Sequence, residues 1–361
     1  MSPISVPSIR RRPTACAPAR RLRVSVEWRR WVAAAVTAVA ASAVAPAWAE
    51  SPAGASQAPA RTINEWLTRM HEASRLRAYT GTLVVTAGTS MSASKIWHVC
   101  DGTRQMERVD TLTGEPRTTL RRDNEVITFI PESRTAVVEK RESLGLFPDL
   151  LRTPDNLIPG FYSVRELGHQ RVAGHLADMV EILPKDDLRF GYRIWSEQGS
   201  GLVVKLQTLG PQGSVLEQVA FTELQMDAPV SMDKLAATMK DTRGYEVVKP
   251  ALRKTTAEAQ GWRLKEPVPG FASMSCHVRD PDASGKPSPG SMQWVFSDGL
   301  ASVSLFVEPY DPRQHVQEKA AAMGATQSVS RRIGEYWVTA LGEVPRATLK
   351  RFTRSLERAR P

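Results

Sequence analysis

The chain has 361 residues, a length that accommodates about two domains of ordinary size. Its formal net charge is +10, but residues 1–49 hold eight arginines and a single acid, Glu27. This stretch contributes +7 and leaves only +3 for the rest of the chain. Because the rest is close to neutral, the composition argues against a nucleic-acid-binding protein.

The N-terminal stretch has the order of a secretory signal peptide. A basic region ends at Arg29-Arg30, an apolar run follows over 31–45, and Ala47-Trp48-Ala49 has the small-x-small spacing of a cleavage site. We expect residues 1–49 to be removed on export. An uncleaved anchor is the alternative, since a membrane-spanning helix needs ~20 apolar residues. Residues 50–60 are predicted to be a disordered lead-in.

Two cysteines remain after the signal peptide, Cys100 and Cys276. Export allows a disulfide, because oxidising compartments preserve such bonds. The two cysteines fall in different predicted domains, so we expect unpaired, packed thiols, and pairing stays open.

The mature chain begins with a helix signal. Thr62 and Glu65 have the spacing of a capping box, in which each side chain bonds the other residue's backbone N–H. Apolar residues then recur at helical spacing. They are Ile63, Trp66, Leu67, Met70 and Ala73. The pattern fades before residue 79.

Short strands follow, separated by Gly, Pro, Asp and Asn. Four apolar runs lie within 80–131 and four more within 175–224. Such runs favour an antiparallel meander, and the lack of strand–helix alternation argues against a parallel sheet. The intervening segment 143–167 is apolar but interrupted by three prolines, so we expect loops and short helical turns there.

The domain boundary is predicted from a polar, aperiodic segment. Residues 240–262 have no clear period and are interpreted as a linker. They separate a large domain, residues 61–239, from a small domain, residues 263–361. In the small domain, Asp311-Pro312 is expected to begin a helix that ends at Gly324, and a last helix is expected after Pro345.

The segment 291–309 is predicted to be a β-hairpin. Asp298-Gly299 suits a two-residue turn, which would pair Phe296 with Ala301. Alternate side chains then share one entirely apolar face, which must be buried. The other face is mainly polar but carries three apolar side chains. These are Val295, Leu300 and Phe306.

The sequence contains no familiar catalytic motif. A nucleophile elbow, a P-loop, a dinucleotide glycine motif, H-E-x-x-H and C-x-x-C are all absent from it. His98 with Cys100, and Cys276 with His277, form a weak candidate for a metal site, since two pairs so far apart meet by chance. We predict no catalytic residue, no metal and no cofactor.

The broad sheet allows two interpretations of the large domain. An antiparallel sheet can curl around an apolar ligand cavity, as in barrel-like lipid carriers. It can equally enclose a filled core, and composition alone favours the filled core.

Five stretches together carry a family resemblance, in this order along the chain. They are WLTRMHEASRLRAYTGTLVV (66–85), RVAGHLADMVEILPKDDLRFGYRIWSEQGSGL (171–202), LEQVAFTEL (216–224), FSDGLASVSLFV (296–307) and VTALGEVPRATLKRF (338–352). They resemble the MucB/RseB family, periplasmic negative regulators of the extracytoplasmic stress sigma factor. The resemblance runs from about Thr62 to the end of the chain.

The resemblance implies a mainly β protein with some α structure. The large domain would be a half-open antiparallel β-barrel covered by helices, similar to lipoprotein carrier folds, and the small C-terminal domain an α+β unit. The protein would act in the periplasm and bind the periplasmic domain of a membrane-spanning anti-sigma factor. It would shield that partner from site-1 proteolysis. Lipopolysaccharide or mislocalised lipoprotein would trigger release, and the state of homo-oligomerisation stays open.

The family pattern supplies no short binding motif, so the candidate site residues are chosen by side-chain character. The residues expected to contact acyl chains are Trp66, Met70, Phe129, Leu146, Phe147, Leu150, Leu151, Leu157, Ile158 and Phe161. The residues expected to contact the partner are Trp294, Phe296, Leu300, Phe306, Tyr336 and Trp337. The latter are favoured because edge strands accept extended peptides and aromatic residues are enriched at interface centres. A plain core role for Trp294 and Phe296 is equally consistent with the sequence.

Two other functions remain open on the sequence. A periplasmic lipid or lipoprotein carrier would use the same cavity without an anti-sigma partner, although the extra small domain argues against it. A hydrolase with unrecognised catalytic residues is the third hypothesis.

Overall fold

The computed structural model describes residues 61–140, 157–250, 252–279 and 291–359. These residues all belong to one compact unit, which spans Ala58–Pro361. The predicted signal peptide and lead-in lie outside the described residues. Four of the residues expected to contact acyl chains also lie outside them, namely Leu146, Phe147, Leu150 and Leu151.

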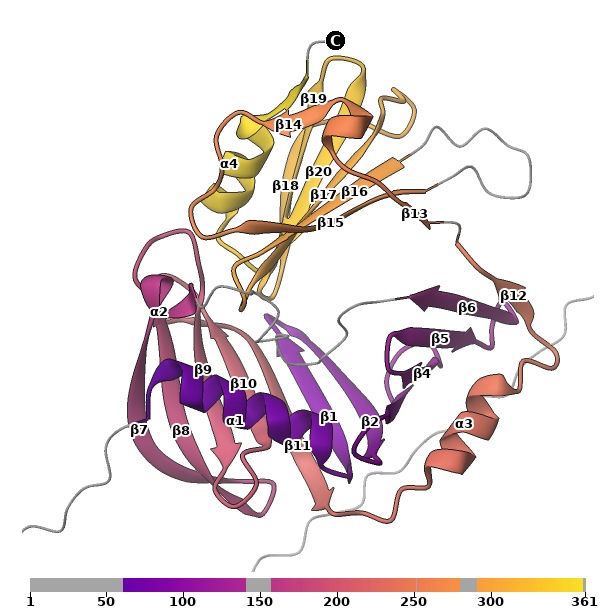
Figure 1. Cartoon of the computed structure of the whole chain (residues 1–361), viewed down its shortest axis with the longest axis vertical. Helices are drawn as coiled ribbons and strands as arrows, with labels where there is room; N and C mark the ends of the chain where they lie inside the picture. Colours follow the sequence, from indigo (N-terminus) through magenta and orange to yellow (C-terminus); the bar gives the residue numbers. More distant parts are fainter. Residues whose placement is uncertain (1–60, 141–156, 251, 280–290, 360–361) are drawn as a thin grey trace, which may run out of the picture. The chain divides into compact units, whose positions relative to one another are not determined.

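Among the described residues, those up to Val248 supply one open sheet of twelve strands (Figure 1). In spatial order they are β12 (Glu246–Val248), β6 (Thr135–Lys140), β5 (Glu125–Ile130), β4 (Thr118–Arg122), β3 (Gln105–Thr111), β2 (Ser90–Cys100), β1 (Tyr79–Ala87), β11 (Val215–Met226), β10 (Val203–Leu209), β9 (Gly191–Glu197), β8 (His175–Pro184) and β7 (Tyr162–Val172). All neighbours are antiparallel except β12 and β6. The predicted antiparallel, half-open barrel is confirmed, since β7 and β12 leave the sheet unclosed.

The first helix forms as the sequence predicts. α1 (Ile63–Leu76) begins at a complete capping box, in which Glu65 Oε2 accepts from the Thr62 backbone N–H at 2.6 Å. All five residues of its apolar stripe are buried. Four of them pack against β8, β9 and β10 together with the short helix α2 (Ile158–Phe161), and Ala73 joins the adjoining cluster that includes Tyr79 of β1. α1 thus covers one face of the sheet (Figure 1).

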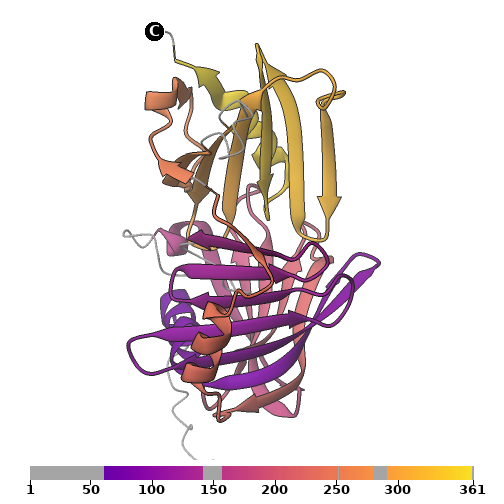
Figure 2. The same cartoon turned by 90° about the vertical axis from the view of Figure 1, so that its right-hand side faces the viewer.

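A second helix, α3 (Met232–Lys240), covers the opposite face of the same sheet. Tyr79 in β1 packs with Ala73 of α1 and lies opposite His98 in β2, which in turn lies opposite Glu107 in β3. These three side chains therefore share the α1 face of the sheet. The next residue back along β3, Met106, therefore points to the other face, where it packs with Leu235 of α3. Figure 2 shows α3 lying against the strands of this half of the sheet.

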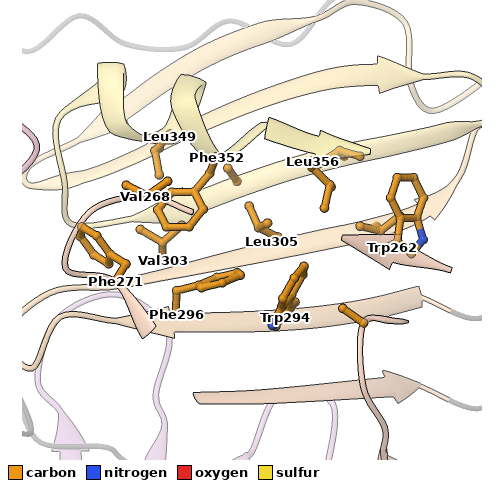
Figure 3. Packing of buried hydrophobic residues seen from close by; sticks show 14 of the residues in the cluster. Trp262, Val268, Phe271, Trp294, Phe296, Val303, Leu305, Leu349, Phe352 and Leu356 are labelled. Atoms are coloured by element: carbon orange, nitrogen blue, oxygen red, sulfur yellow. The ribbon is translucent and has the colours of Figure 1, made fainter. Parts of the chain in front are cut away.

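The later part of the chain forms a seven-stranded antiparallel sheet. Its order is β13 (Leu252–Lys254), β15 (Ala272–Arg279), β16 (Ser291–Ser297), β17 (Ser302–Pro309), β20 (Tyr336–Gly342), β19 (Thr326–Ile333) and β18 (Lys319–Met323). α4 (Arg346–Ser355) packs on one face (Figure 3). A 3-10 turn, η1 (Glu258–Gln260), and the strand pair of β14 (Trp262–Leu264) and β21 (Leu356–Arg358) complete this body.

The segment predicted as a linker holds two short strands. β12 joins the large sheet by pairing with β6, and β13 joins the small sheet by pairing with β15. The chain therefore passes from one sheet to the other between Val248 and Leu252.

The structure corrects three local predictions. The hairpin turn has four residues, since Ser297 pairs with Ser302, so Phe296 opposes Val303 rather than Ala301. The apolar face is nevertheless the buried one. No helix begins at Asp311 and ends at Gly324, because residues 319–323 pair with β19 as a strand. Residues 162–167 begin β7 rather than a loop.

Candidate binding site at the junction of the two sheets

The residues expected to contact acyl chains divide between two places. Trp66, Met70 and Ile158 lie together in the cluster under α1 and α2, with Phe161 packed against it. Leu157, just before α2, has 42% of its surface exposed. Of the six described members of the set, these five lie in or next to α1 and α2.

Phe129 does not join them. It packs in the cluster on the α3 face of the sheet, with its ring edge-on to Tyr245 at 5.1 Å between centroids. Successive side chains on β5 face opposite sides of the sheet, and Phe129 occupies a position that faces α3 rather than α1. An acyl chain beside Trp66 would have no access to Phe129 through the sheet.

The residues expected to contact the partner are also dispersed. Trp294 and Phe296 lie in the core under α4, where the Phe296 ring lies 4.9 Å from that of Phe352 (Figure 3). Tyr336 meets Trp262 edge-on at 5.1 Å. Their strands, β16 and β20, have neighbours on both sides. Neither strand can therefore accept an added peptide strand.

Trp337 and Phe306 occupy the opposite face of the small sheet. Trp337 is buried, because the His315 ring stacks on it at 4.9 Å. His315 Nδ1 accepts from the Asp311 backbone N–H, which directs its Nε2 toward Glu308 at 3.2 Å. Phe306 is half-buried on this face.

Leu300 behaves differently from the rest of its set. It comes from the β16–β17 turn of the small sheet, yet it packs in the cluster under α1 and α2 of the large sheet. Members of both predicted sets, Ile158 and Leu300, thus meet at one place. This place is the junction of the two sheets.

Asp298, two residues before Leu300, organises the junction. Its Oδ1 accepts from the backbone N–H groups of Leu300 and Ala301 at 2.9 and 2.7 Å, which shapes the four-residue turn. Its Oδ2 accepts from the Tyr162 hydroxyl at 2.9 Å and from Arg189 Nε at 2.6 Å. The carboxylate is therefore fully satisfied by donors from both sheets.

Arg189 is the large-sheet partner of Asp298. Its side chain, like that of Asp298, is 0% exposed. Nη1 donates to Asp186, and Nη2 donates to the Pro269 carbonyl oxygen at 2.7 Å. Two aromatic rings stack on the guanidinium, from Phe161 at 4.3 Å and from Phe271 at 4.8 Å.

The close packing around Arg189 requires a glycine. Gly270 has φ +77°, and a Cβ atom there would lie 2.1 Å from Arg189 Nη2. The same Cβ would lie 2.7 Å from the Phe161 ring. A side chain at this position is excluded by both the backbone conformation and the space.

Two further contacts join the sheets. The Thr348 hydroxyl, in α4, donates to the Leu188 carbonyl oxygen at 2.8 Å. Ala325, in the β18–β19 turn, donates its backbone N–H to Glu217 Oε2 at 3.3 Å.

We refer to Tyr162, Arg189, Gly270 and Asp298, with the two phenylalanines that enclose Arg189, as the junction cluster.

The junction cluster is a buried ionic contact rather than a reactive site. Burial, and then the neighbouring Tyr192 and Asp298, raise the pKa of Tyr162 well above its usual value. Its hydroxyl therefore stays a neutral donor. Removing either partner of a buried ion pair is strongly destabilising, because it leaves an uncompensated buried charge. Such a contact fixes the relative placement of the elements that supply it.

One titratable row lies on the α1 face of the large sheet. His98 is buried, and its Nδ1 is 2.8 Å from the Arg77 carbonyl oxygen. Burial, opposed by the charge of Arg121, raises the pKa of Glu107 to about 7. Because the Glu107 side chain is half-buried rather than fully buried, water in contact with it offsets part of the desolvation that raises its pKa.

Other site classes find no support within the described residues. Those residues contain no group of three or more His, Cys, Asp or Glu placed to hold a metal ion. Cys100 and Cys276 are both free thiols. None of the helices in the described ranges is long and apolar enough to cross a membrane.

Sequence reasoning missed Arg189, Asp298 and Tyr162. Arg189 and Asp298 are 109 positions apart, and neither belongs to a recognisable motif. The only local signal was the Asp-Gly pair of the hairpin, which predicted a turn but not a charged partner for it.

Two family models match the chain. The model of the MucB/RseB N-terminal domain matches residues 62–239, and the model of the MucB/RseB C-terminal domain matches residues 256–357. The sigma factor AlgU regulatory protein MucB of Pseudomonas aeruginosa is 29% identical over 302 residues, which cover 82% of this chain and 91% of that protein. The sigma-E factor regulatory protein RseB of Escherichia coli is 24% identical, over 84% of this chain and 93% of the relative.

Solved structures extend this similarity to the fold. The crystal structure of MucB in complex with MucA(peri) matches with a TM-score of 0.63 and 26% identity, covering 82% of this chain and 99% of that one. A crystal structure of MucB alone matches with a TM-score of 0.58 and 25% identity, covering 82% and 97%.

Proposed function

Since the chain belongs to the MucB/RseB family, we propose that it is a periplasmic regulator that binds the periplasmic part of a membrane-spanning anti-sigma factor. The observation that carries this proposal is the match, over nearly the full length of the relative, to a MucB chain in complex with MucA(peri). The relatives compared above are sigma factor regulatory proteins. Binding rather than catalysis is accordingly the proposed activity.

We further propose that the bound partner is shielded from site-1 proteolysis and released by lipid-like envelope signals. The large sheet would hold the acyl chain near α1 and α2, beside Trp66, Met70, Ile158 and Phe161. Each methylene buried there would contribute ~0.8 kcal/mol, so one long chain has enough free energy to offset a protein–protein contact. Lipopolysaccharide and mislocalised lipoprotein both supply such chains.

The junction cluster would couple the two events. Phe161 ends α2 and stacks on Arg189, and Tyr162 follows directly and bonds Asp298. An acyl chain that enters under α2 would displace both residues from the Arg189–Asp298 contact. The small sheet would then lose its fixed placement, and a partner that spans both sheets would bind more weakly. The ligand shifts this equilibrium only if it binds the loosened arrangement better.

The test uses the mature protein and the periplasmic fragment of the anti-sigma factor from the same bacterium. Calorimetry should show binding with 1:1 stoichiometry, and site-1 protease should cleave the fragment more slowly when the protein is present. A diacylated lipopeptide should restore cleavage. If the fragment neither binds nor gains protection from the protease, the proposed function is wrong.

A further inference from the structure

The small sheet has an open edge, and we propose that this edge binds an extended segment of the anti-sigma partner as an added β-strand. The inference rests on the proposed function and names the place where that partner docks. β18 ends the sheet and, among the described residues, pairs only with β19 (Figure 2). All five of its residues are exposed.

The other edge strands of the large sheet and the small sheet are poorer acceptors. β12 and β13 have only three residues each. β7 is longer, but its register with β8 shifts between Glu166 and His169, and Arg165 and Arg171 add charge along it. Bulges and charges are the usual means by which edge strands avoid further pairing. The register of β18 with β19 is unbroken, and Lys319 is its single charged residue.

The turn to β19 determines which backbone groups of β18 point outward. Met323 pairs with Thr326, so Gly324 and Ala325 form a two-residue turn, with Gly324 at φ +59° as such turns require. A two-residue turn closes on a hydrogen-bonded pair. Bonded and non-bonded pairs then alternate along the antiparallel ladder.

The alternation leaves two alanines facing outward. Lys319, Ala321 and Met323 bond to β19, whereas Ala320 and Ala322 present their N–H and C=O groups at the open edge. An incoming strand would use these four groups. Peptide recognition by strand addition takes its affinity from such main-chain bonds and its specificity from alternate side chains.

The side chains around the edge indicate the chemistry of the occupant. Among the large apolar residues described, Val316 and Met323 have the greatest exposed fractions, 81% and 70%. The three alanines between Lys319 and Met323 leave room for larger side chains on an added strand. The segment that fits is therefore extended and apolar, with an acidic residue placed opposite Lys319.

The same edge lies next to a contact with the large sheet. Ala325 donates to Glu217 Oε2, and a Cβ atom on Gly324 would lie 2.7 Å from the Ala87 Cβ. A strand added to β18 would thus run toward the end of β1. The partner would contact both sheets, which is the condition for the junction cluster to govern its release.

The test is a pair of proline variants with matched serine controls. Ala320→Pro and Ala322→Pro each remove an outward-facing donor, and proline is tolerated in edge strands where the N–H faces solvent. Ala320→Ser and Ala322→Ser keep that donor. Calorimetry with the anti-sigma fragment should show at least ~10-fold weaker binding by the proline variants and less than ~2-fold change for serine. Each variant must first match the wild-type circular dichroism spectrum.

Hydrogen exchange on the wild-type protein gives an independent readout. The Ala320 and Ala322 amides should exchange rapidly in the free protein and become protected when the fragment binds. Wild-type affinity in both proline variants, or rapid exchange of both amides in the complex, overturns the inference while leaving the proposed function intact. A wild-type protein that fails to bind the fragment overturns both.

Discussion

Replacement of Arg189 by methionine should uncouple the two sheets. The substitution keeps a long apolar stem but removes the charge from a contact in which both partners are fully buried. Asp298 would keep three donors, from Tyr162, Leu300 and Ala301, yet would lose its counter-ion. The expected loss is therefore that of a broken buried ion pair, about 3–5 kcal/mol.

Scanning calorimetry of the mature protein measures this effect. For a protein of this size, a loss of 3–5 kcal/mol lowers Tm by roughly 5–8 °C. Because the contact joins two sheets with separate cores, the wild-type protein should melt in one transition and Arg189→Met in two. Adding Asp298→Asn removes the carboxylate charge that Arg189→Met leaves without a counter-ion. The double variant should therefore lose less free energy of unfolding than the sum of the two single variants.

Arg193→Met is the matched control. Arg193 lies four residues along the chain and pairs with Glu181 at 2.6 Å, but both belong to the large sheet. Arg165 also pairs with Glu181, so the carboxylate keeps a partner. The Glu181 side chain is 4% exposed, but Arg193 is 31% exposed and Arg165 remains as a counter-ion, so the loss should be about 1 kcal/mol. A single transition in Arg189→Met, with stability within about 1 kcal/mol of wild type, would refute the assigned role of the junction cluster.

Two further predictions concern Gly270 and Glu107. Gly270→Ala forces a Cβ into Arg189 and Phe161, so it should cost about 2–4 kcal/mol, whereas Gly88→Ala, at φ +60° with nothing within 4 Å, should cost only about 1 kcal/mol of backbone strain. Equal losses in chemical denaturation would contradict the packing argument. The folded-state pKa of Glu107 is raised from 4.5 to about 7, so its ionised form destabilises the fold increasingly as pH rises through that interval. Glu107→Gln should therefore unfold at the same temperature as wild type at pH 4. At pH 8 it should unfold at a higher temperature, equivalent to a stabilisation of about 1–3 kcal/mol. A pH-independent difference would show that Glu107 ionises normally.

Local signals in the sequence predicted local structure well. α1 was predicted with its cap and its buried stripe, because both depend on residues within four positions of each other. The buried face of the 291–309 hairpin was also predicted, since strand alternation alone decides it. Its turn was not, because the Asp298 side chain bonds two N–H groups ahead and lengthens the loop.

Features that depend on distant residues could not be predicted in this way. Residues 311–324 have helix punctuation at both ends, but pairing with β19 overrides the helix propensity of the alanines in β18. Phe129 was grouped with Trp66 by composition, although the register of β5 places it on the other face of the sheet. The Arg189–Asp298 pair has no local signature and exists only once both sheets have formed.

Lipid bound at the cluster under α1 and α2 should weaken partner binding through the junction cluster. The most direct measurement is the Kd of the anti-sigma fragment with and without saturating diacylated lipopeptide, for the wild-type protein and Arg189→Met. We expect at least ~10-fold weaker binding with lipid in the wild type, which is a coupling free energy of about 1.4 kcal/mol, and less than ~2-fold change in the variant. A wild-type Kd that saturating lipid leaves unchanged, or equal lipid effects in the two proteins, would contradict it.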